Sequence, residues 1–326
     1  MGTRRVAVRT LRALTPAVPD RRPLRPFLLL FLIGLAFAAE FAAAAPASWG
    51  DLQTRPPPAT AGLRIAYGRA PSQFGELRLP DGAGPHPVVV LLHGGCWSRG
   101  FDLRYLSQLA DAITREFGVA TWNVEYRRLG EPGGGWPGTM LDVAQAVDHL
   151  RALAPEHRLD AGRVIAVGHS AGGQLALWLG SRPRLRPNSA VYRPQPLAVQ
   201  GVIGLAPITD LVAFGEGPGG CNAAVDDLMG GTSTQQLARY SLVSPRALLP
   251  LAVSQWLIQG ELDPIVPTAG VRAYAAAARS EGDASELRVI PDAGHFEPVL
   301  TQGAAWDALR EALRTLLAPK PVPPQS

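Results

Sequence analysis

Short continuous apolar runs recur between residues 63 and 317, and they are separated by longer stretches with a helical spacing of apolar positions. The runs at 87–92, 164–167 and 202–205 are typical of strands buried on both faces of a sheet. Further strands are predicted at 63–67 and 76–79, as an opening antiparallel pair, and at 119–124, 254–258 and 287–290. Apolar stripes predict helices at 102–117, 139–153, 175–179, 268–279 and 306–317. This alternation predicts an α/β fold with a mostly parallel central sheet and helices on both faces.

Three segments interrupt this alternation and divide the chain. Residues 48–62 are rich in Pro, Ala and Gly and are predicted to be a linker. Residues 207–250 are rich in Gly and Pro, with a short helical patch near 235–240, and they predict a lid or loop insertion over a site. A Pro-rich tail follows at 318–326. One α/β domain over 63–317 remains, and its length suits a single large core.

The first 47 residues have the parts of a secretory signal peptide. Arginines come first, an apolar run follows at 27–37, and small residues extend to Ala47. The run is short for a membrane span, and Glu40 follows it closely. We therefore expect an exported protein, periplasmic or secreted. The alternative is an N-terminal anchor that is retained, and contact with a membrane is expected only in that case.

Charge and cysteine content narrow the class further. The formal net charge is +4, but residues 1–45 hold seven arginines and two acids, so the rest of the chain is close to neutral. A nucleic-acid partner is not expected, because such binders carry a basic face on the folded domain. Cys96 and Cys221 could pair in an oxidising compartment. Their pairing stays open, and free thiols are favoured because Cys96 lies inside a motif whose backbone must stay free.

The first candidate for chemistry is the segment Gly168-His169-Ser170-Ala171-Gly172, which matches G-x-S-x-G. An apolar strand precedes it and helix-forming residues follow it. Such a strand-to-helix turn strains its central residue and leaves the serine hydroxyl exposed at the sheet edge. An ordinary serine N-cap is the alternative. We predict that Ser170 is a nucleophile.

A nucleophilic serine needs a base, and the base needs an acid that orients it. Among six histidines, His295 is the one on a loop after the last predicted strand, at the edge where parallel sheets collect their sites. Asp263 follows the strand at 254–258, and the order Ser170, Asp263, His295 is the order of nucleophile-elbow hydrolases. Glu261 and Asp292 are the alternatives for the acid.

A tetrahedral intermediate also needs donors for its oxyanion. His93-Gly94-Gly95-Cys96-Trp97 follows the buried strand at 87–92, and glycines let backbone N–H groups face a ligand. The predicted donors are the N–H groups of Gly95 and Cys96, or of Gly94 in place of one, together with that of Ala171. His93 is predicted to brace the loop. A tight turn without this function is the alternative.

Together these motifs resemble the α/β-hydrolase superfamily over residues 63–317. The 93–97 motif resembles the H-G-G-x-W motif of kynurenine formamidases and related bacterial carboxylesterases. Cys96 stands where hormone-sensitive-lipase-like esterases carry a third glycine. Segments 123–127, 136–137 and 244–245 resemble runs of the same group and are predicted to have packing roles.

The resemblance implies an α/β-hydrolase fold with a small lid-like insertion and a serine esterase that works through an acyl-enzyme. Its substrate would be a small-molecule ester or amide. An arylformamidase or other amide hydrolase with the same three residues is the alternative, and the expected export favours the esterase. A non-catalytic binding member of the fold is less expected, because none of the three residues is missing. The sequence has no zinc motif, P-loop or dinucleotide motif, so we expect no metal and no cofactor.

Overall fold

The computed structural model describes residues 45–318, and one eight-stranded sheet runs through them. The strands lie in the order β1-β2-β4-β3-β5-β6-β7-β8. Strand β2 pairs antiparallel with both β1 and β4, and the other neighbours are parallel. The bounds are β1 Leu63–Ala66, β2 Phe74–Arg78, β3 His86–Leu92, β4 Ala120–Val124, β5 Leu159–His169, β6 Gly201–Leu205, β7 Ser254–Gly260 and β8 Ser285–Ile290. The predicted mostly parallel α/β sheet and its antiparallel opening pair are confirmed.

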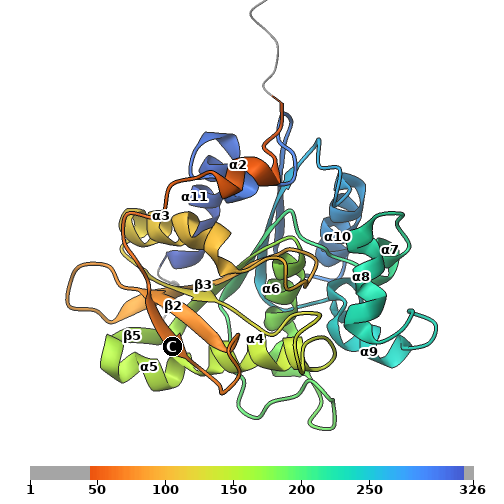
Figure 1. Cartoon of the computed structure of the whole chain (residues 1–326), viewed down its shortest axis with the longest axis horizontal. Helices are drawn as coiled ribbons and strands as arrows, with labels where there is room; N and C mark the ends of the chain where they lie inside the picture. The colour runs from red at the N-terminus through yellow and green to blue at the C-terminus, as the bar shows by residue number, and fades with distance from the viewer. Residues whose placement is uncertain (1–44, 319–326) are drawn as a thin grey trace, which may run out of the picture. The chain divides into compact units, whose positions relative to one another are not determined.

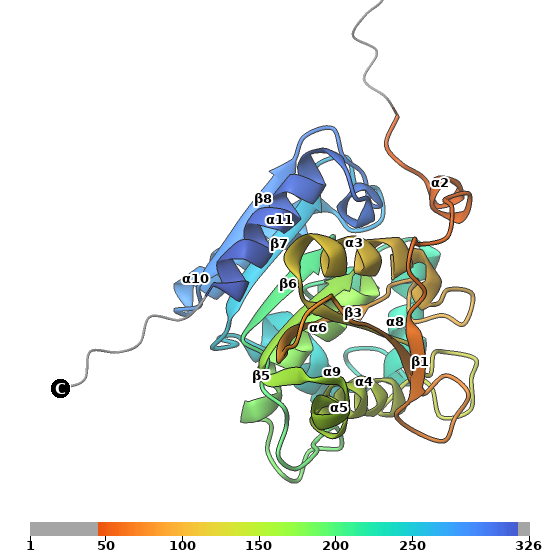
Figure 2. The same ribbon diagram turned by 90° about the vertical axis from the view of Figure 1, so that its left-hand side faces the viewer.

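Helices cover both faces of this sheet (Figures 1 and 2). On one face α3 (Ser107–Phe117) and α11 (Gly303–Leu317) pack against Val89 and Leu91 of β3. On the other face Val88, Val90 and Leu92 join a larger core. That core includes residues of α4 (Gly138–Asp148), α5 (Leu150–His157), α6 (Ala171–Ser181) and α10 (Thr268–Ser280). Side chains that alternate along a strand therefore supply two separate cores.

Two predicted helices differ in detail from the structure. The predicted helix at 102–117 begins as the 3-10 turn η1 (Leu103–Leu106) before α3, and Gly118 ends α3 with φ 62°. The predicted helix at 139–153 is two helices, α4 and α5, that meet at His149. Apolar spacing continues across His149, so the pattern alone does not reveal the break.

The segment predicted to be a linker packs on the domain. Within 48–62, the helix α2 (Trp49–Gln53) begins at a capping box of Ser48 and Asp51. Leu52 is buried in the core shared by α3 and α11. The few apolar side chains among the prolines explain the difference, since they give this segment a face to bury.

The insertion at 207–250 folds into short helices that lie together (Figure 1). They are α7 (Leu211–Gly215), α8 (Gly220–Met229), α9 (Leu237–Val243) and the 3-10 turn η3 (Pro245–Leu248). The predicted patch at 235–240 overlaps α9, whereas α8 was not predicted. Its apolar side chains Val225, Leu228 and Met229 are buried in the larger core.

The predictions for residues 1–44 and for the tail from 319 onward lie outside the described residues. Among residues 45–318, no helix is both long and apolar enough to cross a membrane. In the same range, no three His, Cys, Asp or Glu side chains are grouped so that they could hold a metal ion.

Candidate active site

Ser170 lies at the tight turn between β5 and α6 with a strained backbone, φ 57° and ψ −120°. A Cβ on Gly168 would lie 2.0 Å from the carbonyl oxygen of Gly172. A Cβ on Gly172 would lie 2.1 Å from that of Leu92 at the end of β3. Both positions therefore need glycine for the turn to close. The strain at Ser170 is the kind that proteins retain at functional sites.

His295 and Asp263 form a short hydrogen bond. His295 Nδ1 lies 2.7 Å from Asp263 Oδ2, and both side chains are buried. The other Asp263 oxygen accepts the backbone N–H groups of Ile265 and Val266 at 2.8 and 2.9 Å. A carboxylate fixed in this way orients the imidazole ring of His295. It also favours the tautomer that carries its proton on Nδ1, so that Nε2 is left to accept a proton.

The environment keeps Asp263 ionised. Burial alone would raise its pKa. The hydrogen bond and charge of His295, with the N–H donors of Val266 and Ile265, outweigh burial and hold the pKa of Asp263 below its ordinary value. The carboxylate is thus available to stabilise a positive charge on His295.

The two alternative acids lie elsewhere. Glu261 is exposed and pairs with Arg272 at 2.6 Å. Asp292 is also exposed, three residues before His295. Of the three carboxylates considered, Asp263 is the one that contacts the His295 ring.

Ser170, Asp263 and His295 follow β5, β7 and β8 at the same edge of the sheet. Among the described contacts, no hydrogen bond joins the Ser170 hydroxyl to His295, and the second ring nitrogen of His295 has no partner. Hydrogen bonds of this kind are often loose without substrate and shorten in the reacting complex.

The loop after β3 presents free backbone donors beside Ser170. Gly95 and Cys96 have φ of 94° and 53°. Within residues 45–318, the N–H groups of Gly95, Cys96 and Ala171 donate no hydrogen bond. The N–H of Gly94 is used, since it donates to the Tyr105 hydroxyl. This corrects the place given to Gly94 among the expected donors: its part is close approach, because a Cβ there would lie 2.8 Å from Ser170 Cβ.

Tyr105, which the sequence reading did not single out, connects this loop to the histidines. Its hydroxyl lies 3.0 Å from His169 Nδ1, and His169 Nε2 lies 2.9 Å from the carbonyl oxygen of His295. A carbonyl only accepts, so the His169 proton is on Nε2 and Nδ1 accepts from Tyr105. Burial, then the nearby His295, lowers the pKa of His169 to about 3, which keeps its ring neutral. In the sequence Tyr105 is one position within the predicted helix at 102–117, so no local signal marks it.

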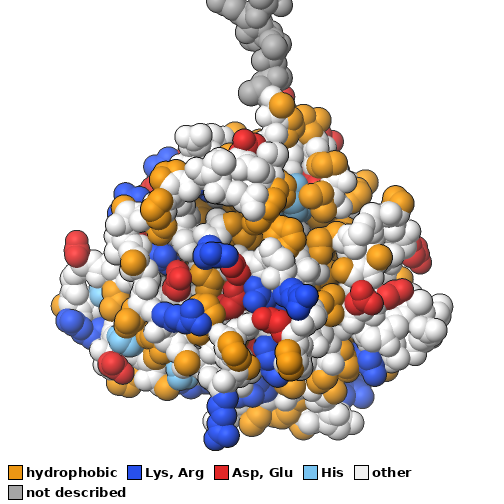
Figure 3. Space-filling view, viewed as in Figure 1, with side chains coloured by type: hydrophobic (Ala, Val, Ile, Leu, Met, Phe, Trp, Pro, Cys, Tyr) orange, Lys and Arg blue, Asp and Glu red, His pale blue; other side chains and the backbone are white. Residues whose placement is uncertain are grey.

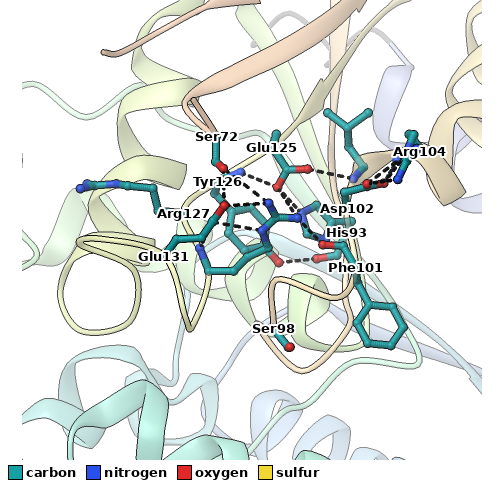
Figure 4. Close-up of polar contacts among 12 residues, drawn as sticks. Ser72, His93, Ser98, Phe101, Asp102, Arg104, Glu125, Tyr126, Arg127 and Glu131 are labelled. Carbon is teal, nitrogen blue, oxygen red and sulfur yellow. Dashed lines mark hydrogen bonds and ion pairs between the residues drawn. The ribbon is translucent and has the colours of Figure 1, made fainter. Parts of the chain in front are cut away.

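A cluster of buried polar side chains around Glu125 contacts the loop that follows β3 (Figure 4). Glu125 accepts from His93 Nε2 at 2.9 Å and from the Leu103 N–H at 3.2 Å, and it pairs with Arg128 at 3.3 Å. The His93 ring stacks on Tyr126 at 4.3 Å. His93 therefore has the position of a brace for the loop.

The two cysteines form a disulfide, which corrects the preference for free thiols. Cys96 and Cys221 are joined with their Cα atoms 5.1 Å apart, although 125 residues separate them in sequence. The bond uses only side chains, so the backbone N–H of Cys96 stays free. The expectation failed because a bonded sulfur does not use up the N–H of its own residue as a hydrogen-bond donor.

A cavity of about 600 Å³ lies between the segment 49–62 and the start of α3, and Ser170, Asp263 and His295 are not among the residues that line it. Trp49 and Tyr105 line it. Trp49 also contacts Phe101 and Phe296, with ring centroids 4.7 and 6.2 Å apart. On the face seen in Figure 3, positive and negative side chains are interspersed among apolar ones.

Comparison with known proteins gives a family match. The family model described as BD-FAE matches residues 76–276, more than half of the chain. That range contains Ser170, Asp263 and the loop at 94–97, whereas His295 lies beyond it.

Three curated proteins are similar over shorter stretches. Neutral cholesterol ester hydrolase 1 of Pongo abelii is 34% identical over 99 residues, 29% of this chain and 23% of that protein. Kynurenine formamidase avaC of Aspergillus versicolor is 31% identical over 134 residues, 37% of this chain and 44% of that protein. The probable carboxylic ester hydrolase LipM of Mycobacterium tuberculosis is 30% identical over 130 residues, 39% of this chain and 28% of that protein. The matches thus span less than half of each relative.

Solved structures share the fold over most of the chain. A truncated carbohydrate esterase from gut microbiota has a TM-score of 0.68 at 16% identity, over 80% of this chain and 99% of that one. Esterase 2 of Thermogutta terrifontis has a TM-score of 0.64 at 20% identity, over 79% of this chain and 94% of that one. At these identities the likeness shows the α/β-hydrolase fold alone.

Proposed function

Because the chain belongs to the BD-FAE family, we propose that it is a serine hydrolase that cleaves carboxylic esters through an acyl-enzyme. The observation that carries the proposal is the 2.7 Å bond between Asp263 and His295 at the sheet edge where the strained Ser170 turn also lies. Relatives named as ester hydrolases support the reaction class.

In the first step the Ser170 hydroxyl oxygen attacks the ester carbonyl carbon while His295 Nε2 takes the hydroxyl proton. The new C–O bond gives a tetrahedral intermediate, and the imidazolium that forms is stabilised by the Asp263 carboxylate. His295 then returns the proton to the alcohol oxygen as the ester C–O bond breaks. The alcohol leaves, and the acyl group stays on Ser170.

The negative charge of the intermediate is received by the N–H groups of Gly95, Cys96 and Ala171. These donors have no competing partner within the described residues, and they are fixed before the charge develops. Fixed donors in a site that excludes water are usually the largest contribution to catalysis of acyl transfer. Water then repeats the sequence: His295 takes a proton from water as the water oxygen attacks the acyl carbon. The bond between the acyl carbon and Ser170 Oγ then breaks, His295 returns the proton to Oγ, and the carboxylic acid leaves.

The substrate class is a small-molecule ester, with a formamide as the second candidate. The His93–Trp97 motif and the similarity to a kynurenine formamidase are the reasons to keep a formamide as the second candidate. We place the protein outside the cytoplasm, periplasmic or secreted. The leader-like pattern of residues 1–47 and the Cys96–Cys221 bond support this, since disulfides persist mainly in oxidising compartments. Contact with a membrane enters only if the N-terminal segment is retained.

The test uses wild type and Ser170→Ala with p-nitrophenyl esters of two to eight acyl carbons and with N-formylkynurenine. We expect ester turnover by wild type, loss of it in Ser170→Ala, and labelling of Ser170 alone by a fluorophosphonate probe. Equal turnover by both proteins would refute the serine mechanism. Preferred cleavage of N-formylkynurenine would establish the formamidase instead.

A further inference from the structure

The disulfide joins two segments with different roles in the site. Cys96 lies in the loop that carries two of the proposed oxyanion donors, and Cys221 is in the first turn of α8, inside the insertion. Relying on the proposed function, we propose that the Cys96–Cys221 bond positions the oxyanion donors and that the enzyme is fully active only when this bond is intact.

Hydrogen bonds hold the loop on both sides of Cys96 but not at Cys96. The Gly94 N–H is held by Tyr105, the Gly95 carbonyl accepts the Ser98 N–H at 2.9 Å, and the Trp97 carbonyl accepts the Leu129 N–H at 2.7 Å. The Trp97 indole N–H also donates to Gln174 at 3.2 Å. Within residues 45–318, neither the N–H nor the carbonyl of Cys96 makes a hydrogen bond. The sulfur bond is therefore the direct anchor of this residue.

The backbone of Cys96 needs such an anchor. Cys96 and Trp97 both have φ of 53°, in the left-handed region that residues with a Cβ rarely adopt. A residue in this conformation persists only when its surroundings impose it. Trp97 has its buried indole and its hydrogen bonds, whereas Cys96 has the bond to Cys221.

The other end of the bond is a rigid support. Leu228 and Met229 of α8 are buried in the larger core, and the Leu228 carbonyl accepts the Trp136 N–H at 2.8 Å. At the start of α8, the Asn222 side chain accepts the Gly219 N–H at 3.0 Å and so fixes the turn before Cys221. Through the disulfide, the oxyanion loop is therefore attached to a helix that is itself fixed in the core.

Breaking the bond frees Cys96 without removing its N–H. Reduction by dithiothreitol cleaves the S–S bond, places a hydrogen on each sulfur and leaves the reductant as a cyclic disulfide, with two electrons transferred. Cys96 can then leave the left-handed region. Its N–H turns away from the oxyanion position, while the Gly95 and Ala171 donors remain.

The experiment compares oxidised wild type, dithiothreitol-reduced wild type and Cys221→Ser, which leaves Cys96 unchanged. With the ester that wild type cleaves best, we expect kcat to fall about 10- to 100-fold in the reduced protein and in the variant. KM should change less than about threefold, because ground-state binding does not use the oxyanion donors. The affinity for an alkyl trifluoromethyl ketone, whose adduct with Ser170 carries an oxyanion, should fall in parallel with kcat/KM. Reoxidation should restore wild type, and reductant should not affect Cys221→Ser.

A matched control separates positioning from stability. Leu313→Ala removes buried side-chain volume in α11, on the opposite face of the sheet. It should lower the melting temperature while kcat and ketone affinity stay at wild-type values. If reduced wild type and Cys221→Ser behave like Leu313→Ala, the bond is structural only and the inference fails. If oxidised wild type is not labelled at Ser170 by the fluorophosphonate, the proposed function fails instead.

Discussion

The Nε2 atom of His169 donates a 2.9 Å hydrogen bond to the backbone carbonyl of His295. The residue before the proposed nucleophile thus holds the loop that carries the proposed base. On its other side, His169 accepts from Tyr105, which itself accepts from the Gly94 N–H. Three consecutive hydrogen bonds therefore connect the oxyanion loop, the turn of Ser170 and the loop of His295.

Removal of the Tyr105 hydroxyl should disturb this connection. Tyr105→Phe leaves the Gly94 N–H and His169 Nδ1 without their partner, at a cost of about 1 kcal/mol for each bond. We expect kcat to fall about tenfold with KM nearly unchanged, because the loss affects alignment. Steady-state kinetics on the best ester measure this. Tyr274→Phe is the matched control, since it removes a buried hydroxyl bonded to Gln255 on the far side of the fold. Equal kcat in both variants would contradict a positioning role.

The choice of Asp263 over Glu261 can be tested by neutral isosteres. Asp263→Asn removes the charge and reverses the polarity of the contact with His295, and comparable changes cost about 10⁴-fold in kcat. Glu261→Gln removes only an exposed pair with Arg272 and should leave kcat within about twofold. Measured kcat for the two variants decides between the two acids, and a larger loss in Glu261→Gln would assign the role to Glu261.

Local sequence signals predicted much of the fold and the proposed catalytic residues. The runs at 87–92 and 164–167 have no polar position, so they predict buried parallel strands. Gly168 and Gly172, on either side of Ser170, mark a tight turn, because a Cβ at either of these two positions would clash with the backbone. The order of Ser170, Asp263 and His295 follows from this topology, because the carboxyl ends of β5, β7 and β8 share one edge.

What the sequence could not predict depends on contacts between distant segments. Cys96 and Cys221 are 125 residues apart, and their approach requires the packing of α8 on the core. Tyr105 has no local signal, since its hydroxyl acts on residues 11 and 64 positions away. The helix α2 forms in a Pro-rich segment because Leu52 has a core to enter, and a segment viewed alone does not show that core.

The low pKa of His169 predicts a pH dependence of stability. Between about pH 3 and 6.5 the unfolded chain protonates this histidine, whereas the folded protein keeps it neutral. The contribution of the neutral His169 ring to the free energy of unfolding is therefore complete above pH 6.5. It is lost as the pH falls through this window, at up to about 1.4 kcal/mol per pH unit. Asp263, whose pKa is also lowered, contributes only below its ordinary value of 3.8.

Urea unfolding between about pH 4.5 and 6.5 separates the contribution of buried histidines from that of the carboxylates, since most carboxylates titrate lower. His169→Gln should flatten the fall in unfolding free energy. A smaller slope should remain, because burial also lowers the pKa of His149. Leu313→Ala, which removes no titratable group, serves as the control for a change in stability and should keep the wild-type slope. If His169→Gln keeps the full slope, the buried neutral ring is not its source.

The backbone of Ser170 predicts a trade between stability and activity. Its φ of 57° and ψ of −120° suit glycine, whereas serine and alanine are strained there. Ser170→Gly and Ser170→Ala should both be inactive, since both lack the hydroxyl. Ser170→Gly should nevertheless be more stable than Ser170→Ala by about 1 kcal/mol, because relief of strain exceeds the entropic cost of glycine.

Urea titrations with equal m-values measure this difference, and Ala171→Gly provides the control. Ala171 is the first residue of α6 and has a helical backbone, so glycine there should cost about 0.5–1 kcal/mol. If glycine is more stable than alanine at position 170 but less stable than alanine at position 171, the strain lies in Ser170 alone. If glycine costs as much relative to alanine at position 170 as it does at position 171, the turn stores no strain. Its geometry would then be what the packing of β5 and α6 favours for any residue, independent of the serine that the turn presents.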